Sequence, residues 1–419
     1  MFHDKLHIAH AITLLLDHVD DPLPVVDLSK LLQDDPQENL SIETVTISVD
    51  VLSIIANSAH PVSRSHHIFY DTEILAIVHR SKSKESGLVS TTVWCWLGKQ
   101  CQFKDREDKK LRELATRYGT SPIMVHQLAE PIELVRVLGG QLVIRQVRHR
   151  NYIPTIRLTL KINSQGTRSH WTAENTTMHL VRSQSGVIFI DEHDLNIKNL
   201  CSAFSYCFTI LGTVYVWHGL GSVHSEREAA LAYACTLDEH MTPIEMTEGT
   251  NDQDEIFWMM LGDDAFAHAD YWRWRKMAVA YDPRIWRVDG SNSNPVIPVP
   301  HISLEQDIPR SVYIIDCVWE LFVVVGKDAR GNRLSIRLAL NVAIEMSKRA
   351  ALQCPFPPTV HALVLPSKLP LDLQLNVRDL DEAWLNNGDI PDHMNVLPCK
   401  EALEHVSVRF IIPDFTKAS

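Results

Sequence analysis

Several features that mark whole classes of protein are missing from this chain of 419 residues. No stretch approaches the roughly 20 consecutive apolar residues that a membrane-spanning helix needs. The apolar run near the N-terminus is short and flanked by acidic residues, so we expect neither a membrane span nor a secretion signal. Basic residues are in deficit, with 40 Lys and Arg against 52 Asp and Glu and a net charge of -12. This balance argues against nucleic acid as a partner.

Paired cysteines and the motifs of common enzymes are missing as well. The eight cysteines include no CxxC pair, so we expect reduced thiols in the cytosol and no disulfide framework. There is no P-loop, GxSxG, HExxH or GxGxxG dinucleotide turn, and the sequence therefore predicts a protein that is not an enzyme. Hydrophobic residues at 45% and charged residues at 22% are ordinary for a globular protein that buries its own core.

One phrase occurs three times, at spacings of just over a hundred residues. It reads TTVWCWLGKQC around Trp96, GTVYVWHGLGS around Trp217 and ELFVVVGKDAR around Val324. In each copy an apolar strand runs into a glycine and then a helix, and we expect the glycine to permit a sharp turn. Repetition at a fixed long period indicates one supersecondary unit copied along the chain. The length agrees, because 419 residues suffice for about three domains.

The pattern predicts an N-terminal helical appendage and linker over residues 1–40, followed by repeats over residues 41–150, 151–282 and 283–419. Each repeat alternates like a short mixed β-sheet, with a long helix after the glycine and a shorter helix near its end. In the second repeat the expected strands are TIRLTLKI, GVIFID and GTVYVWHG. The fold class is therefore α/β (α+β), with each central sheet sandwiched between a long and a short helix.

The order of these phrases resembles the gelsolin and villin superfamily. PRIWRVDG, SVYIID and ELFVVVGKDA are similar to three successive strands of that repeat, and VHQLAEPIELVRVLGG looks like its closing strand and helix. Three repeats resemble the severin and capping-type members or one half of gelsolin. The resemblance implies an actin-filament-binding protein of the cytoplasm and cytoskeleton, regulated by calcium, that severs or caps filaments.

The resemblance also implies calcium ligands. The family's site combines a strand carboxylate, the backbone carbonyl before it and a glutamate near the start of the long helix, and calcium favours such oxygen donors. In the second repeat Glu226 matches the helix glutamate, and Asp238 resembles an aspartate that holds a second calcium at the actin interface. Ser185 and Gly186 fall where the strand carboxylate is expected, so that ligand is lacking. A solvated helix surface is the alternative interpretation of both acids.

The other two repeats differ from the second in these ligands. The first repeat offers Thr72 and Glu73 on the strand and Asp105 on the helix. Acids at a helix start are also common for reasons of the helix dipole alone. In the third repeat Arg333 replaces the helix acid, and because a cation repels calcium, we expect no metal there.

Two surfaces are expected to contact partners. The helix AALAYACTLDE has Ala and Leu on almost every side and resembles the actin-binding helix of the family. Its candidate residues are Ala229, Ala232, Tyr233 and Thr236, unless this surface packs against a neighbouring repeat. The run RQVRHR occupies the place of a phosphoinositide-binding segment in gelsolin, which makes Arg145, Arg148 and Arg150 candidates for lipid headgroups or simply a solvated connector.

The sequence is also consistent with a second function. Gelsolin-like domains also occur in non-catalytic scaffold and coat-type proteins that have lost actin and calcium binding. The departures from the calcium pattern favour this alternative, since a fold survives the loss of ligands that sit on loops and helix ends.

Overall fold

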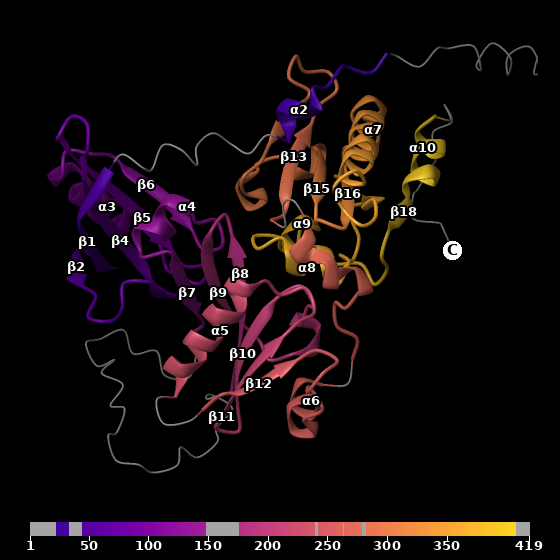
Figure 1. The fold of residues 1–419 in the computed structure, drawn as a ribbon. Helices are drawn as coiled ribbons and strands as arrows, with labels where there is room; N and C mark the ends of the chain where they lie inside the picture. Colours follow the sequence, from indigo (N-terminus) through magenta and orange to yellow (C-terminus); the bar gives the residue numbers. More distant parts are fainter. Residues whose placement is uncertain are drawn as a thin grey trace, which may run out of the picture. The chain divides into compact units, whose positions relative to one another are not determined.

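The computed structural model describes residues 22–32, 44–147, 176–238, 242–262, 264–278 and 282–407. These residues form two compact units, one over Asp35–Lys276 and the other over Met277–Ser419 together with Met1–Asp34. The first unit contains two of the three predicted repeats, and the second contains the third repeat (Figure 1).

The first repeat is built on a five-stranded sheet in the order β2-β1-β4-β5-β6. Its long helix α3 follows β5, and its short helix α4 follows β6. The elements are β1 (Thr44–Ile55), β2 (Ser58–Pro61), β3 (Ile68–Tyr70), β4 (Ile74–Ser83), β5 (Val89–Leu97), α3 (Asp105–Arg117), β6 (Pro122–His126), α4 (Ile132–Val137) and β7 (Gln141–Arg145).

The second repeat has the same arrangement, with strands in the order β9-β8-β10-β11-β12. Strands β7 and β3 of the first repeat extend this sheet beyond β9, because β7 pairs with β9 in parallel. The elements are β8 (Thr177–Gln184), β9 (Val187–His193), η3 (Ile197–Asn199), β10 (Ser205–Ile210), β11 (Thr213–His218), α5 (His224–Leu237), β12 (Ile244–Thr247), α6 (Glu255–Leu261) and the 3-10 helix η4 (Asp270–Met277).

The third repeat has a six-stranded sheet in the order β14-β13-β15-β16-β17-β18. The elements of its first half are β13 (Arg284–Val288), β14 (Val296–Pro298), η5 (Ile302–Leu304), η6 (Ile308–Arg310), β15 (Val312–Asp316) and β16 (Glu320–Val325). The elements of its second half are α7 (Arg333–Ala350), β17 (Thr359–Val364), α8 (Leu371–Asn376), α9 (Glu382–Leu385), β18 (Val396–Pro398) and α10 (Cys399–Ser407).

The three sheets share one topology, which confirms the predicted fold. Strands β5, β11 and β16 each pair in parallel with the strand that follows the long helix. Parallel neighbours need a crossover connection, and the long helices α3, α5 and α7 provide it. The motif residues Trp96, Trp217 and Val324 are buried at matching places on these central strands.

Backbone oxygen atoms approach the repeated glycines so closely that no side chain fits. A Cβ atom on Gly98 would lie 2.2 Å from the carbonyl oxygen of Asp71, and one on Gly219 would lie 2.3 Å from that of Ser202. At Gly326 the nearest backbone oxygen would also lie at 2.3 Å. None of the three has a positive φ, so close approach of the backbone and not a sharp turn is what requires glycine.

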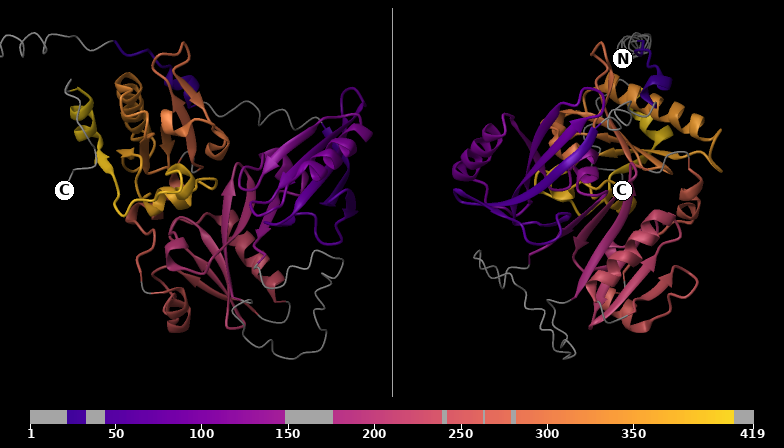
Figure 2. Two further views of the ribbon diagram at one scale, coloured as in Figure 1. Left: turned by 180° about the vertical axis from the view of Figure 1, so that it is seen from behind. Right: turned by 60° about the vertical axis from the view of Figure 1, so that its left-hand side comes forward.

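A segment near the N-terminus packs into the core of the third repeat. Helix α2 (Leu28–Leu31) places Leu28 in the buried cluster that lies under α7, and Leu23, Val26, Leu31 and Leu32 pack against that cluster. Figures 1 and 2 show the indigo segment beside β13. The helix predicted before it, and the strand TIRLTLKI of the second repeat, lie outside the described residues.

Within the described ranges, no helix combines the length and the apolar character needed to cross a membrane.

Candidate functional site

Backbone hydrogen bonds that recur in the three repeats identify the residues that correspond to one another at the predicted metal position. The N–H of the residue two places after the glycine donates to a carbonyl ahead of the central strand pair: Gln100 to Asp71 at 2.8 Å, Gly221 to Ser202 at 2.8 Å and Asp328 to Pro309 at 2.6 Å. The glycine N–H itself donates at 3.0 Å to Glu73, Phe204 and Ser311, respectively. These three residues therefore occupy one structural position, and Ala203 is the counterpart of Thr72.

The strand position expected in the second repeat is corrected by this comparison. Ser185 and Gly186, with φ values of 46° and 77°, form the tight turn between β8 and β9. Two-residue hairpin turns favour such left-handed conformations. Strands β8 and β10 were missing from the sequence prediction, and this displaced the alignment. The true counterpart of the strand carboxylate is Phe204, which has no charge.

Glu226 forms a buried ion pair with Arg275 at the start of α5. Arg275 Nη1 lies 2.9 Å from Glu226 Oε2, and Arg275 Nη2 lies 3.0 Å from Glu226 Oε1. The backbone N–H groups of Ser183 and Val223 donate to the same carboxylate at 2.9 and 3.1 Å. Arg275 is 1% exposed and Glu226 is 0% exposed. Both oxygen atoms of this carboxylate therefore accept hydrogen bonds from protein groups.

Arg275 also contacts the two residues that precede β10 at this position, Ala203 and Phe204. Its Nη1 donates to the carbonyl oxygen of Ala203 at 2.8 Å. Its guanidinium carbon lies 4.7 Å from the centre of the Phe204 ring, and that of Arg182 lies 5.0 Å from the same ring. Guanidinium groups at this distance are attracted to the negative face of an aromatic ring.

The second repeat therefore does not fit a calcium ion at Glu226. The carbonyl of Ala203 and both oxygens of Glu226 are bonded to Arg275, and the third expected donor is replaced by the ring of Phe204. A second cation at the same donors would meet the fixed positive charge of the guanidinium. More generally, within the residues that the structure describes, no three His, Cys, Asp or Glu side chains gather closely enough to hold a metal.

In the first repeat the strand carboxylate is again bound to an arginine. Glu73 accepts a short hydrogen bond from Arg64 and a bond of 3.0 Å from the N–H of Tyr70. Burial raises the pKa of the Glu73 carboxyl, and the Arg64 charge offsets this rise only in part. Asp105 is exposed as the first residue of α3. A calcium site at Thr72, Glu73 and Asp105 remains a prediction.

Asp238 lies at the C-cap of α5, at the opposite end of the helix from Glu226. With a rise of 1.5 Å per residue, the two acids are roughly 18 Å apart along the helix. They cannot serve one ion, and a separate site at Asp238 remains a prediction.

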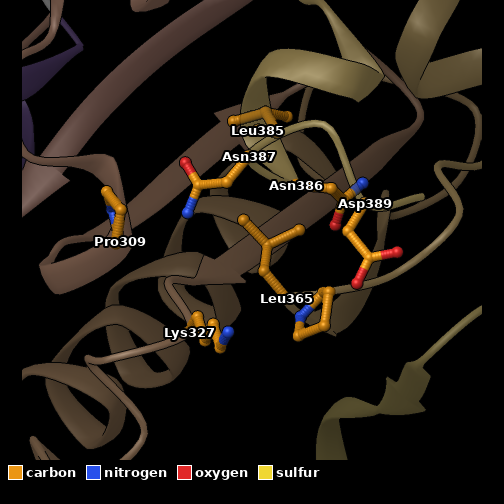
Figure 3. Close-up of a pocket in the computed structure, with 8 residues that line it drawn as sticks. Pro309, Lys327, Leu365, Leu385, Asn386, Asn387 and Asp389 are labelled. Atoms are coloured by element: carbon orange, nitrogen blue, oxygen red, sulfur yellow. The ribbon is translucent and has the colours of Figure 1, made fainter. Parts of the chain in front are cut away.

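The third repeat carries arginine where the others carry an acid. Arg333 is the first residue of α7, at the same distance from its glycine as Glu226 and Asp105 are from theirs. A pocket of about 190 Å³ lies beside the Gly326 turn, between Pro309, Lys327, Leu365 and Asp389 (Figure 3). Its volume is below the roughly 300 to 1,000 Å³ of typical small-molecule sites. We therefore do not regard it as an active site.

Helix α5 buries one face and leaves the other open. Tyr233 lies in the core beneath the helix with Val216 and Cys207, so it does not belong to a contact surface. Ala232 and Thr236 are exposed and Ala229 is half-buried, while Leu231 and Cys235 are exposed beside them. The open face of α5 consists of the exposed residues Leu231, Ala232, Cys235 and Thr236, together with the half-buried Ala229, which also packs against the core.

Arg145 is a strand residue and not part of a connector. It ends β7, and its Nε donates to the hydroxyl oxygen of Tyr233 at 3.2 Å. Its guanidinium carbon lies 5.7 Å from the centre of the Tyr233 ring. Arg148 and Arg150 lie outside the described residues. Lipid binding by this run remains a prediction.

Sequence reasoning missed Arg275, Ala203 and Phe204. One signal was present in the third repeat, where Arg310 and Ser311 are the counterparts of Ala203 and Phe204. Ala203 precedes Gly219 by the same number of residues as Arg310 precedes Gly326. A direct alignment of the second and third repeats would have found the strand position. Nothing in the sequence around DYWRWRK indicates that its second arginine reaches the start of α5.

Comparisons with known proteins give a distant sequence match to gelsolin. The chain is 23% identical over 249 residues to "Gelsolin, cytoplasmic" from Halocynthia roretzi, covering 57% of this chain and 32% of that protein. It also matches a chain in the crystal structure of the Thorarchaeota 2DGel3/rabbit actin complex, with 13% identity, a TM-score of 0.20, and coverage of 50% of this chain and 98% of that one. A TM-score this low carries no weight here. No family model matches the sequence.

The repeated motif, the three sheets of one topology and the sequence match agree. The chain is thus similar in sequence to a gelsolin, and it repeats one α/β module three times. It spans about a third of the length of the Halocynthia roretzi protein, 32%.

Proposed function

We propose that this chain is a non-catalytic, cytoplasmic protein that binds actin filaments through the open face of α5. Actin is the partner that the gelsolin resemblance implies. The observation that carries the proposal is the contrast among the three long helices. Helix α3 exposes charged residues such as Arg106, Lys109 and Arg117, and most of the apolar surface of α7 is buried within its own unit. Only α5 among the three presents an exposed face of small and apolar side chains.

Such a face suits insertion against another protein. Ala229, Ala232 and Thr236 follow one another at helical spacing and leave the backbone of α5 accessible to close approach. Leu231, at 39% exposure, adds an apolar side chain that costs free energy in water. Filament severing, filament capping and regulation by calcium at the first repeat are further activities that we propose only in addition to filament binding.

Filament pelleting tests this function with one variant of α5 and one of α3. Ala232→Arg adds a large charged side chain to the open face, and we expect it to weaken co-sedimentation with filamentous actin about tenfold or more. Thr116→Arg makes a similar change on the exposed side of α3 and should leave sedimentation unchanged. Equal sedimentation of both variants and the wild type would exclude the open face of α5.

The scaffold or coat-type alternative is favoured by one specific observation. Arginine pairs with or replaces an expected calcium ligand in every repeat, as seen for Arg64, Arg275 and Arg333. If the wild type fails to sediment with filaments both with calcium and with a chelator, the actin hypothesis is wrong and the alternative remains.

A further inference from the structure

Arg275 makes the contacts that a cation at this position would make. One nitrogen, Nη1, lies 2.8 Å from the Ala203 carbonyl oxygen and 2.9 Å from Glu226 Oε2, and Nη2 lies 3.0 Å from Glu226 Oε1. The acid that would add a second negative charge is replaced by Phe204, which instead stacks on the guanidinium. The site has thus lost one carboxylate and gained one permanent positive charge.

We propose that Arg275 is a built-in cation, which holds the second repeat in one state whether or not calcium is present. The proposal deepens the proposed function, because it concerns regulation of the repeat that carries the open face of α5. The proposal rests on the proposed function in one respect, namely that calcium would otherwise regulate this repeat.

Burial makes this arrangement permanent. Arginine stays protonated at all physiological pH values, so the positive charge cannot be removed. Neither Arg275 nor Glu226 contacts water appreciably, at 1% and 0% exposure, and each would be left as an isolated buried charge without the other. Arg182, 5% exposed and also packed on the Phe204 ring, adds further positive charge to the surroundings.

The ion pair also fixes the segment that leaves the second repeat. Arg275 lies on η4, near the end of the first compact unit, while Ala203 and Glu226 lie before β10 and at the start of α5. Trp272 of the same segment is 1% exposed. Arg275 therefore ties η4 to the strand and helix that form the site, and it does so without help from a metal ion.

The other repeats also have an arginine at the corresponding site. In the first repeat Arg64 binds Glu73, with side-chain exposures of 27% and 14%, so this pair is less buried than the one in the second repeat. In the third repeat Arg333 occupies the position of the helix acid itself. In all three repeats an arginine therefore contacts or occupies a position that is expected for a calcium ligand.

Thermal unfolding of the full chain, with millimolar calcium or with a chelator, tests the proposal. We expect the wild type to have the same Tm in both conditions. Arg275→Ala should lower the Tm in chelator by on the order of 10 °C, because it strands the buried Glu226 charge. Calcium should restore part of that loss, since the vacated donors include a carbonyl and a carboxylate. Terbium luminescence on the same variants reports directly whether an ion binds.

Three further variants make the result decisive. Arg273→Ala removes an exposed arginine of the same segment, which pairs with Asp270, and should leave the Tm unchanged. Glu226→Gln addresses the opposite result: a calcium-dependent rise in the wild-type Tm that disappears in Glu226→Gln would overturn the proposal. A wild-type Tm for Arg275→Ala would overturn it as well. If Arg275→Ala does not fold, Arg275→Lys retains the charge without the two-pronged contact, and its Tm should still fall in both conditions.

These measurements use no actin. Failure of filament binding would leave them unchanged, so the built-in cation and the proposed function are tested separately.

Discussion

The second and third repeats use the same sheet and the same long helix, yet they cover that helix differently. Helix α5 buries four of its 14 residues, whereas α7 buries nine of its 18. The difference arises because α7 packs against α10 on the same side of its sheet, and the N-terminal segment containing Leu28 joins the same core. Helix α5 has sheet on one face only.

The scaffold and the partner surface are therefore separate properties of a repeat. Both repeats have a glycine in close contact with a backbone oxygen, a buried central strand and a parallel strand pair joined by the long helix. These shared features set the architecture. Segments from elsewhere in the chain then decide which helix remains open. The third repeat is completed by the N-terminal segment of the chain, whereas in the described residues the open face of α5 stays exposed.

The shared scaffold gives the largest expected effect. Gly326→Ala would place a Cβ atom 2.3 Å from a backbone oxygen, which cannot move aside as a flexible side chain could. We expect a loss of about 4 kcal/mol in the free energy of unfolding of the third repeat. Gly331→Ala is the matched control, because no atom lies within 4 Å of its Cβ position and its φ is not positive. Urea denaturation of both variants measures the difference, and similar stabilities would contradict the close-approach argument.

Loss of the N-terminal segment that packs with α7 should have an intermediate effect on the free energy of unfolding. Leu28→Asp should cost ~2 kcal/mol, because the segment loses its one deeply buried side chain and detaches from the third repeat. Amide hydrogen exchange across α7 should accelerate. Val25→Asp changes a side chain that is 97% exposed in the same segment, and it should leave exchange unchanged. Unchanged exchange in Leu28→Asp would mean that the segment does not cover α7 in solution.

The arginine of the first repeat gives the smallest effect and sharpens the contrast with Arg275. Arg64→Ala breaks a pair that is partly open to solvent, and we expect a loss of only about 1 kcal/mol. Calorimetry on this variant beside Arg275→Ala compares the two pairs directly. A cost for Arg64→Ala equal to that for Arg275→Ala would show that burial does not separate them.

Much of the fold could be predicted because its signals are local. Alternating apolar residues identified the strands beside Trp96, Trp217 and Val324, and the glycine after each marked the start of the crossover. Strands β8 and β10 escaped prediction, and the opening strand was instead placed at TIRLTLKI. That single displacement moved the expected ligand position to Ser185 and Gly186. For the site, the position of Glu226 at a helix start was visible, but its partner was not.

The repeated motif indicates one α/β module used three times, with an acid or an arginine at the start of each long helix. What those residues contact depends on the tertiary structure. Arg275 and Glu226 are 49 residues apart, and Leu28 reaches a core built from residues beyond Met277. The periodicity of a sequence shows which residues share a face of one helix or strand. Contacts between residues far apart in the sequence depend instead on how the loops return the chain and on which charged groups become buried together.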